Sequence, residues 1–167
     1  MRVVLILAYV MLGVAGIASD VAAQTARDLV GLWRLISCES RDSARVVLYP
    51  FGERPLGQIL YDARGNMSTL LVKPDRPQFA SRDRRRGTDA EVRAAFQGFD
   101  AYFGTYSVDT AKGTVTHHVT GAAYPNWVGG DQLRYYKFEG TRLVLSTPPF
   151  QLGGRPLTTV CVWERRS

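Results

Sequence analysis

The residues most suggestive of chemistry in this chain are two adjacent histidines in a segment of alternating side chains. In the run 114–121, Val115, His117 and Val119 fall on one side of an extended strand, and His118 falls on the other. If the valine side faces the interior, His117 enters it and His118 faces solvent. Imidazole can donate, accept or transfer a proton near neutral pH, so His117 is the best candidate polar group in a cavity. The alternative is a buried histidine that only bonds its neighbours.

Aromatic side chains supply the other candidate groups. Small-molecule pockets are lined mainly by apolar and aromatic residues with a few polar ones among them. Adjacent strand residues split between two faces, so only one of Tyr135 and Tyr136 can join His117. Trp127, ahead of two glycines, is either a lid on a rim loop or a plug in a barrel end. The residues expected to line a ligand site are His117, Tyr61, Tyr106, Tyr135, Trp127 and Asn126. The same aromatics could instead fill a small barrel.

The sequence carries no familiar catalytic motif. No serine lies in a Gly-x-Ser-x-Gly frame, and no phosphate-cradling glycine loop occurs. His117 and His118 point to opposite faces and cannot grip one ion together, so no metal site is expected. No cofactor is expected either. An enzyme of the isomerase, cyclase or hydrolase type stays open, with His117 as acid or base and Tyr106 as its partner.

The two cysteines stand near opposite ends of the chain. If the first and last predicted strands pair antiparallel, Cys38 lies opposite Cys161. Facing cross-strand Cβ atoms are about 4.5 to 5.5 Å apart, which is close enough for a bridge after modest adjustment. A disulfide would join the two ends of the sheet. The alternative is two unrelated buried thiols.

Short alternating segments separated by turns indicate a mostly β, antiparallel fold that can close into a barrel of eight or nine strands. Glycines in the turns 63–65, 110–113 and 139–141 favour tight hairpins. The expected strands are 29–39, 45–49, 57–62, 66–73, 104–109, 114–121, 131–139, 142–147 and 157–165.

One helix is expected to interrupt the strands, at about 89–102. Thr88 and Glu91 form a capping box, and apolar residues at helical spacing continue to Phe103. A helix inserted there would cap or flank one end of a barrel. The arginine-rich loop 73–87 before it is either an anion-attracting lip on a binding site or an ordinary solvated loop.

The first residues predict export. Arg2, the apolar run 3–17 and the small residues that end at Ala23 match a cleavable signal peptide, so residues 1–23 are expected to be removed. The mature chain, 24–167, would be one domain, periplasmic or secreted, with no integral membrane segment. The net charge of +6 suggests nucleic acid in a cytosolic protein, but export removes that partner. A monomer is expected.

The run Gly31-Leu32-Trp33 resembles the Gly-x-Trp signature that opens lipocalins. With the stretches 49–52, 57–62, 103–106 and 126–129, the mature chain resembles the bacterial and fungal lipocalin-like domain family. The resemblance implies a barrel whose floor is closed by Trp33, with Arg165 packed over it. The chain departs from typical lipocalins because its helix interrupts the strands and no Thr-Asp-Tyr motif follows, so vertebrate lipocalin ligands do not carry over.

The function expected from these features is non-catalytic binding of a small, partly hydrophobic molecule in the barrel. Such a ligand would be hydrophobic or amphipathic, and anionic if the positive charge selects it. The cavity enzyme is the first alternative. The second is an envelope protein that binds another protein through the basic loop.

Overall fold

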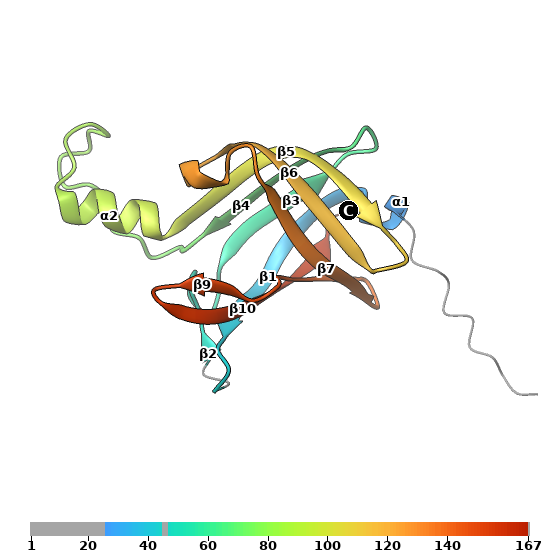
Figure 1. Ribbon diagram of the computed structural model, residues 1–167. Helices are drawn as coiled ribbons and strands as arrows, with labels where there is room; N and C mark the ends of the chain where they lie inside the picture. The colour runs from blue at the N-terminus through green and yellow to red at the C-terminus, as the bar shows by residue number, and fades with distance from the viewer. Residues whose placement is uncertain (1–25, 45–46, 167) are drawn as a thin grey trace, which may run out of the picture.

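The computed structural model describes residues 26–44 and 47–166, and eight of its antiparallel strands close into a barrel (Figure 1). The expected signal peptide lies outside the described residues. The barrel strands are β1 (Gly31–Arg41), β3 (Leu56–Tyr61), β4 (Asn66–Val72), β5 (Phe99–Asp109), β6 (Thr114–Ala122), β7 (Asp131–Glu139), β8 (Arg142–Ser146) and β10 (Arg155–Arg165). Consecutive members of this series pair, and β1 pairs with β10 to close it.

Four short elements and the helix α2 (Asp89–Gln97) lie outside this ring. Strand β2 (Val47–Leu48) pairs with β1, and β9 (Phe150–Leu152) pairs with β10. Helix α1 (Ala26–Leu29) precedes β1, and the 3-10 turn η1 (Pro125–Trp127) joins β6 to β7. None of the helices in the described part of the chain is long and apolar enough to cross a bilayer.

The floor of the barrel is closed around Trp33. This side chain is 1% exposed, and its indole N–H donates to the Leu29 carbonyl over 2.8 Å. The Arg165 guanidinium lies over the indole ring, 4.1 Å from its centroid, and donates to the carbonyls of Val30 and Asp28. Gly31 adopts φ +143°, and a Cβ there would lie 2.5 Å from Arg165. The glycine is therefore needed for this packing.

The register of the closing strands confirms the predicted disulfide. Cys38 pairs with Cys161 across β1 and β10, and their sulfurs are bonded. Both cysteines share the inward side with Trp163, so the bridge lies inside the barrel and joins its first and last strands. The three predicted hairpins are also present, with positive φ at Gly65, Gly113 and Gly140.

The inserted helix is shorter than predicted. Helix α2 (Asp89–Gln97) ends at Gln97 with Gly98 as its C-cap, and Phe99 begins β5. The apolar spacing that suggested a helix up to residue 102 is overridden because Phe99 pairs with Val72 of β4 and the ladder continues to Asn66. Phe103 consequently points outward from a strand. Sequence reasoning also missed β9, which turns into β10 through Gly153 and Gly154.

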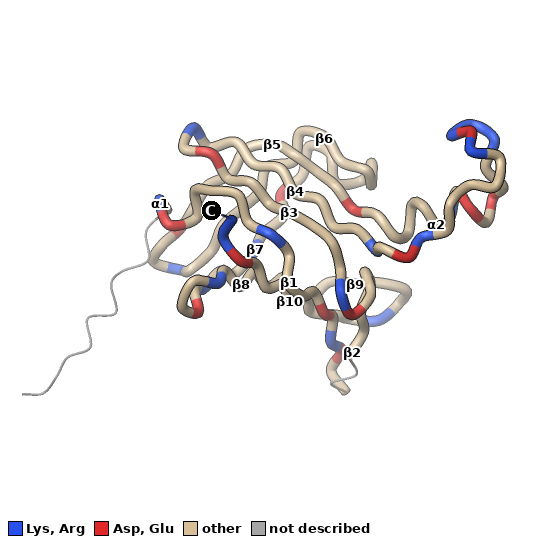
Figure 2. The backbone as a smooth tube through the Cα atoms, turned by 180° about the vertical axis from the view of Figure 1, so that it is seen from behind, with Lys and Arg blue, Asp and Glu red and all other residues tan. Residues whose placement is uncertain are grey.

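Helix α2 lies beyond one end of the barrel (Figure 1). It has no buried residue, and the expected capping box of Thr88 and Glu91 is present. Arg76 ties the preceding loop to the helix by donating to the Ala95 carbonyl. Figure 2 shows basic residues gathered at the far tip of this loop.

Candidate ligand site inside the barrel

A buried histidine stands at the centre of a hydrogen-bonded chain that crosses the barrel interior. His117 of β6 is 0% exposed. Its Nε2 lies 2.7 Å from the Tyr61 hydroxyl of β3, and its Nδ1 lies 2.9 Å from the Tyr102 hydroxyl of β5. Tyr61 is also fully buried, and Tyr102 is 6% exposed. Both imidazole nitrogens are therefore occupied by tyrosines.

A bulge interrupts the pairing of β5 and β6 between Tyr102 and His117. The pairing shifts between Phe103 and Gly104, so that Tyr102 pairs with Ala122 while Gly104 pairs with Val119. A Cβ on Gly104 would lie 1.9 Å from the His118 carbonyl oxygen. Only glycine permits this close approach. The regular alternation of β5 places Tyr102 on the same side as Tyr106, which pairs with His117, so Tyr102 and His117 both face inward.

The three hydrogen-bonded side chains of Tyr61, His117 and Tyr102 are all uncharged at physiological pH. Burial, with further contributions from the charges of Arg134 and His118, lowers the pKa of His117 to about 3. Burial raises the pKa of Tyr61 well above its ordinary value, and burial likewise raises the pKa of Tyr102. His117 is thus a neutral imidazole with one N–H and one lone pair, and both tyrosines keep their protons.

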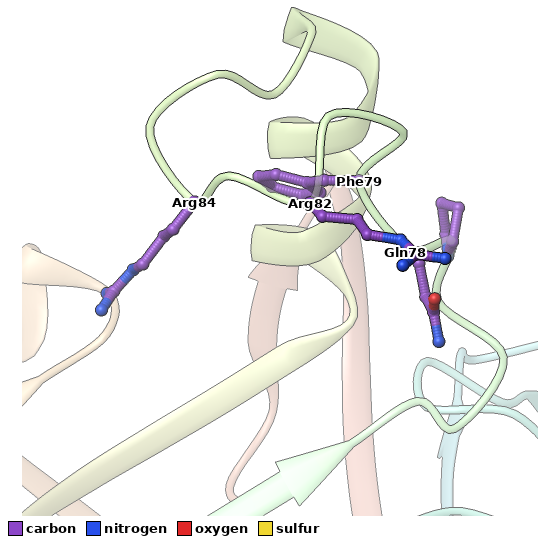
Figure 3. Close-up of a pocket in the computed structure, with 5 residues that line it drawn as sticks. Gln78, Phe79, Arg82 and Arg84 are labelled. Carbon is purple, nitrogen blue, oxygen red and sulfur yellow. The ribbon is translucent and has the colours of Figure 1, made fainter.

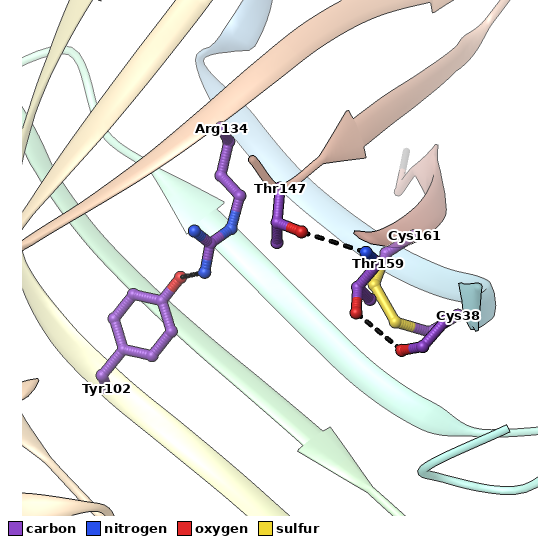
Figure 4. Close-up of a disulfide and its surroundings, with 7 residues drawn as sticks. Cys38, Tyr102, Arg134, Thr147, Thr159 and Cys161 are labelled. Atoms are coloured by element: carbon purple, nitrogen blue, oxygen red, sulfur yellow. Dashed lines mark hydrogen bonds between the residues drawn. A yellow bond between two sulfur atoms is a disulfide. The ribbon is translucent and has the colours of Figure 1, made fainter. Parts of the chain in front are cut away.

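Arg134 of β7 extends this hydrogen-bonded network beyond Tyr102. Its Nη2 lies 3.5 Å from the Tyr102 hydroxyl and 3.4 Å from Gln132 Oε1, and its Nη1 donates to the Leu133 carbonyl over 2.8 Å. Arg134 forms no ion pair with any carboxylate in the described ranges. Figure 4 shows its side chain and that of Tyr102 pointing toward one another.

The barrel interior is tightly buried near the floor and more polar toward the opposite end. Five inward-facing residues at that end, which we call the inner mouth, are all half-buried, so solvent reaches the wall there. They are Asp100, Gln132, Arg134, Thr147 and Thr159. Burial raises the pKa of Asp100 to about 6, against the opposing effects of the Ala101 backbone and Arg134. By contrast, interior residues toward the floor such as Trp33, Tyr61 and Val115 are at most 1% exposed.

Two of the residues predicted to bind ligand belong to the hydrogen-bonded network, and two others pack against it. His117 and Tyr61 are members. The ring of Tyr106 packs edge-on against Tyr61, while its hydroxyl donates to the Asp62 carbonyl and so turns from the inner mouth. Trp127 packs edge-on against Tyr102, with ring centroids 5.5 Å apart.

The structure brings the other two predicted residues to the surface. Asn126 is exposed, and Tyr135 points outward with 47% exposure, whereas its neighbour Tyr136 is buried inside. His118 faces outward as expected, where its ring nitrogens lie 2.7 Å from Asp131 and 3.0 Å from Ser107.

Sequence reasoning missed Tyr102 and Arg134. Alternation along β5 puts Tyr102 on the same side as Tyr106, but the helix expected to reach residue 102 concealed this signal. Arg134 and Tyr136 are two residues apart on β7 and therefore lie on the same face of the strand. Recognising that Tyr136 faces inward would have placed Arg134 inside as well.

A surface depression lies on the loop before α2, outside the strands. Figure 3 shows its lining, which consists of Pro77, Gln78, Phe79, Arg82 and Arg84. It is open to solvent. The described residues contain no cluster of three or more histidine, cysteine or acidic side chains suited to a metal ion.

Comparison with known proteins supports the barrel as the functional unit. Residues 30–166 match the family described as lipocalin-like domain. A carrier protein from Aspergillus oryzae, named for 4'-hydroxy-3'-methoxypropiophenone, is 31% identical over 106 residues, which cover 59% of this chain and 96% of the relative.

Proposed function

We propose that this chain, which belongs to the family of lipocalin-like domains, is an exported carrier that holds one small aromatic molecule at the inner mouth of its barrel. Small-molecule binding follows from the closed barrel and from the relationship to a carrier protein. The ligand class, the position of the ligand and export are our extension. Each has its own support and its own test.

The observation that carries the proposal is the guanidinium of Arg134 on the inner wall. A charge partly removed from water normally pairs with an opposite charge, because desolvation otherwise costs free energy. Arg134 instead has one short bond to the Leu133 carbonyl and two long contacts. The charge of Arg134 lowers the pKa of the inner-mouth residue Asp100, but neither Asp100 nor any other described carboxylate forms an ion pair with it. A cation kept in this condition inside a barrel is suited to an incoming polar group.

An aromatic ligand fits the surroundings of Arg134. Trp127 packs edge-on against both Tyr102 and Tyr124, with ring centroids 5.5 and 5.7 Å apart, which places three aromatic rings together on the side of Tyr102. The Aspergillus relative is named as a carrier of 4'-hydroxy-3'-methoxypropiophenone, which is an aryl ketone. An aryl ketone combines a flat apolar ring with a polar oxygen, and it matches a site that offers aromatic rings and hydrogen-bond donors.

Binding is favoured over catalysis by the state of His117. Both of its ring nitrogens are bonded to tyrosines, and it has no exposed surface through which to reach a substrate. Its pKa of about 3 also makes it a poor proton donor at neutral pH. In this proposal His117 is a positioning residue, and Tyr102 and Arg134 meet the ligand.

Export is supported by the signal-like pattern of residues 1–23 and by the bridge between Cys38 and Cys161, because disulfides persist in oxidising compartments. N-terminal sequencing of the protein from its own source is expected to begin at Gln24. Recovery of chains that still begin at Met1 would reject export.

Isothermal titration of chain 24–167 with 4'-hydroxy-3'-methoxypropiophenone tests the carrier function. We expect one site per chain. Arg134→Gln should weaken binding about tenfold or more, because a hydrogen bond from a charged donor contributes about 1.5 to 3 kcal/mol. Arg142→Gln is the matched control, since Arg142 is exposed at the start of β8. No binding, or equal losses in the two variants, would reject the proposal.

A further inference from the structure

The hydrogen-bonded network of Tyr61, His117 and Tyr102 has one more O–H or N–H proton than it has internal hydrogen bonds. Two tyrosine hydroxyls and a neutral imidazole bring three protons, but only two hydrogen bonds link the three groups. One hydroxyl proton must therefore remain at one end of the chain. Its location decides what the barrel offers to a ligand.

The buried end cannot hold the spare proton without a penalty. Tyr61 is 0% exposed, and its hydroxyl has no hydrogen-bond partner other than His117 Nε2 in the described part of the chain. If Nε2 carried the hydrogen, the Tyr61 proton would be buried without an acceptor. Tyr61 therefore donates to Nε2, and the imidazole hydrogen resides on Nδ1.

The proton that no hydrogen bond within the network uses is therefore the hydroxyl proton of Tyr102. The hydroxyl oxygen of Tyr102 accepts the Nδ1–H of His117 and faces the Arg134 Nη2 at 3.5 Å. Both of these neighbours are donors, so neither can accept the Tyr102 proton. Tyr102 stands beside the half-buried wall of the inner mouth, where Figure 4 shows it turned toward Arg134.

We infer that Tyr102 and Arg134 form a paired donor site for a single acceptor oxygen, and that the site selects ligands with a carbonyl group conjugated to an aromatic ring. This inference deepens the proposed carrier function and rests on it. Tyr61 and His117 do not touch the ligand, but they fix the direction in which the Tyr102 hydroxyl points. A ring with no such oxygen would leave the Tyr102 proton without an acceptor on binding, and would give Arg134 no acceptor beyond Leu133, Gln132 and Tyr102.

A matched pair of ligands tests the inference. The probes are 4'-hydroxy-3'-methoxypropiophenone and its deoxy analogue, in which a methylene replaces the ketone carbonyl while the ring and its substituents are unchanged. Wild-type protein should bind the ketone about ten- to a hundredfold more tightly, as expected for a buried donor that loses its acceptor. Tyr102→Phe should remove most of this preference.

Tyr106→Phe is the matched control, because it deletes a hydroxyl from the same strand and the same inward side. The Tyr106 hydroxyl is already used by the Asp62 carbonyl, so the preference for the ketone should persist. Equal binding of the two probes to wild type, or an unchanged preference in Tyr102→Phe, would overturn the inference while the carrier function stands.

Nitrogen NMR of the free protein gives a readout that needs no ligand. The chain has only two histidines, so the imidazole signals are simple to assign. We expect His117 to carry its hydrogen on Nδ1. A hydrogen on Nε2 would overturn the inference alone, whereas failure of both probes to bind would overturn the carrier function and the ligand assignment together.

Discussion

Acidification should destabilise this protein through His117. The pKa of this residue is about 3 in the folded chain, because burial disfavours its charged form, and the ordinary value is 6.5. Below pH 6.5 the unfolded chain binds a proton that the folded chain does not. The stability that depends on this difference is complete above pH 6.5 and is lost as the pH falls toward 3. One pH unit within that window corresponds to about 1.4 kcal/mol, so the loss at pH 5 is about 2 kcal/mol.

Urea unfolding of chain 24–167 and its His117→Gln variant, from pH 7.5 to 4.5, measures this effect. A glutamine amide can bond both tyrosines but does not titrate. Asp100 titrates within the same range, yet its contribution is common to both proteins and cancels in their difference. We expect the stability advantage of wild type to shrink by about 2 kcal/mol between pH 7.5 and 5. Parallel stability curves would show that His117 titrates normally and that its environment has been misjudged.

Three further changes have defined outcomes. Replacing Cys38 and Cys161 together by serine should lower the free energy of unfolding by roughly 4 to 5 kcal/mol in urea titrations, because the bridge spans 123 residues, and an unchanged midpoint would contradict this. Asp100→Asn should stabilise the protein by up to about 3 kcal/mol at pH 7.5 but not at pH 4. Burial raises the folded pKa of Asp100 from 3.8 to about 6, so stability is lost as the pH rises through that range. Calorimetry at the two pH values checks this, and a larger gain at pH 4 than at pH 7.5 would contradict it. Arg134→Met should raise the melting temperature while weakening ketone binding, because it removes a partly desolvated charge, and retention of full affinity would count against the site.

The barrel could be predicted because its signals are local and repeated. Each predicted hairpin has a glycine where positive φ is required, and period-two alternation identifies the strands around it. The pair Cys38 and Cys161 supplied the one long-range constraint, the closing register of β1 and β10. The Gly-x-Trp run added the floor at Trp33.

The site was harder to predict because it depends on which way single strands face. His117 lies between two valines that mark the interior, and its orientation followed from them. Tyr135 and Tyr136 have no such flanking valines, and the prediction placed Tyr135 in the ligand site although it points outward. Arg134 was overlooked because charged side chains are almost always exposed.

Tyr102 was not predicted as a site residue because a local helix signal extends over it. The capping box at Thr88 starts a real helix, and the phenylalanines that follow keep helical spacing past its end. Strand pairing between β5 and β4 ends the helix at Gln97, and no local pattern reveals that tertiary constraint.

The position of the bound ligand is the central claim, and chemical-shift mapping tests it most directly. Labelled chain 24–167 would be titrated with 4'-hydroxy-3'-methoxypropiophenone while backbone and arginine side-chain signals are followed. We predict the largest changes at Asp100, Tyr102 and Arg134, with smaller ones at Trp127. Changes confined to the loop depression around Phe79 and Arg82, with the inner mouth unaffected, would contradict the account.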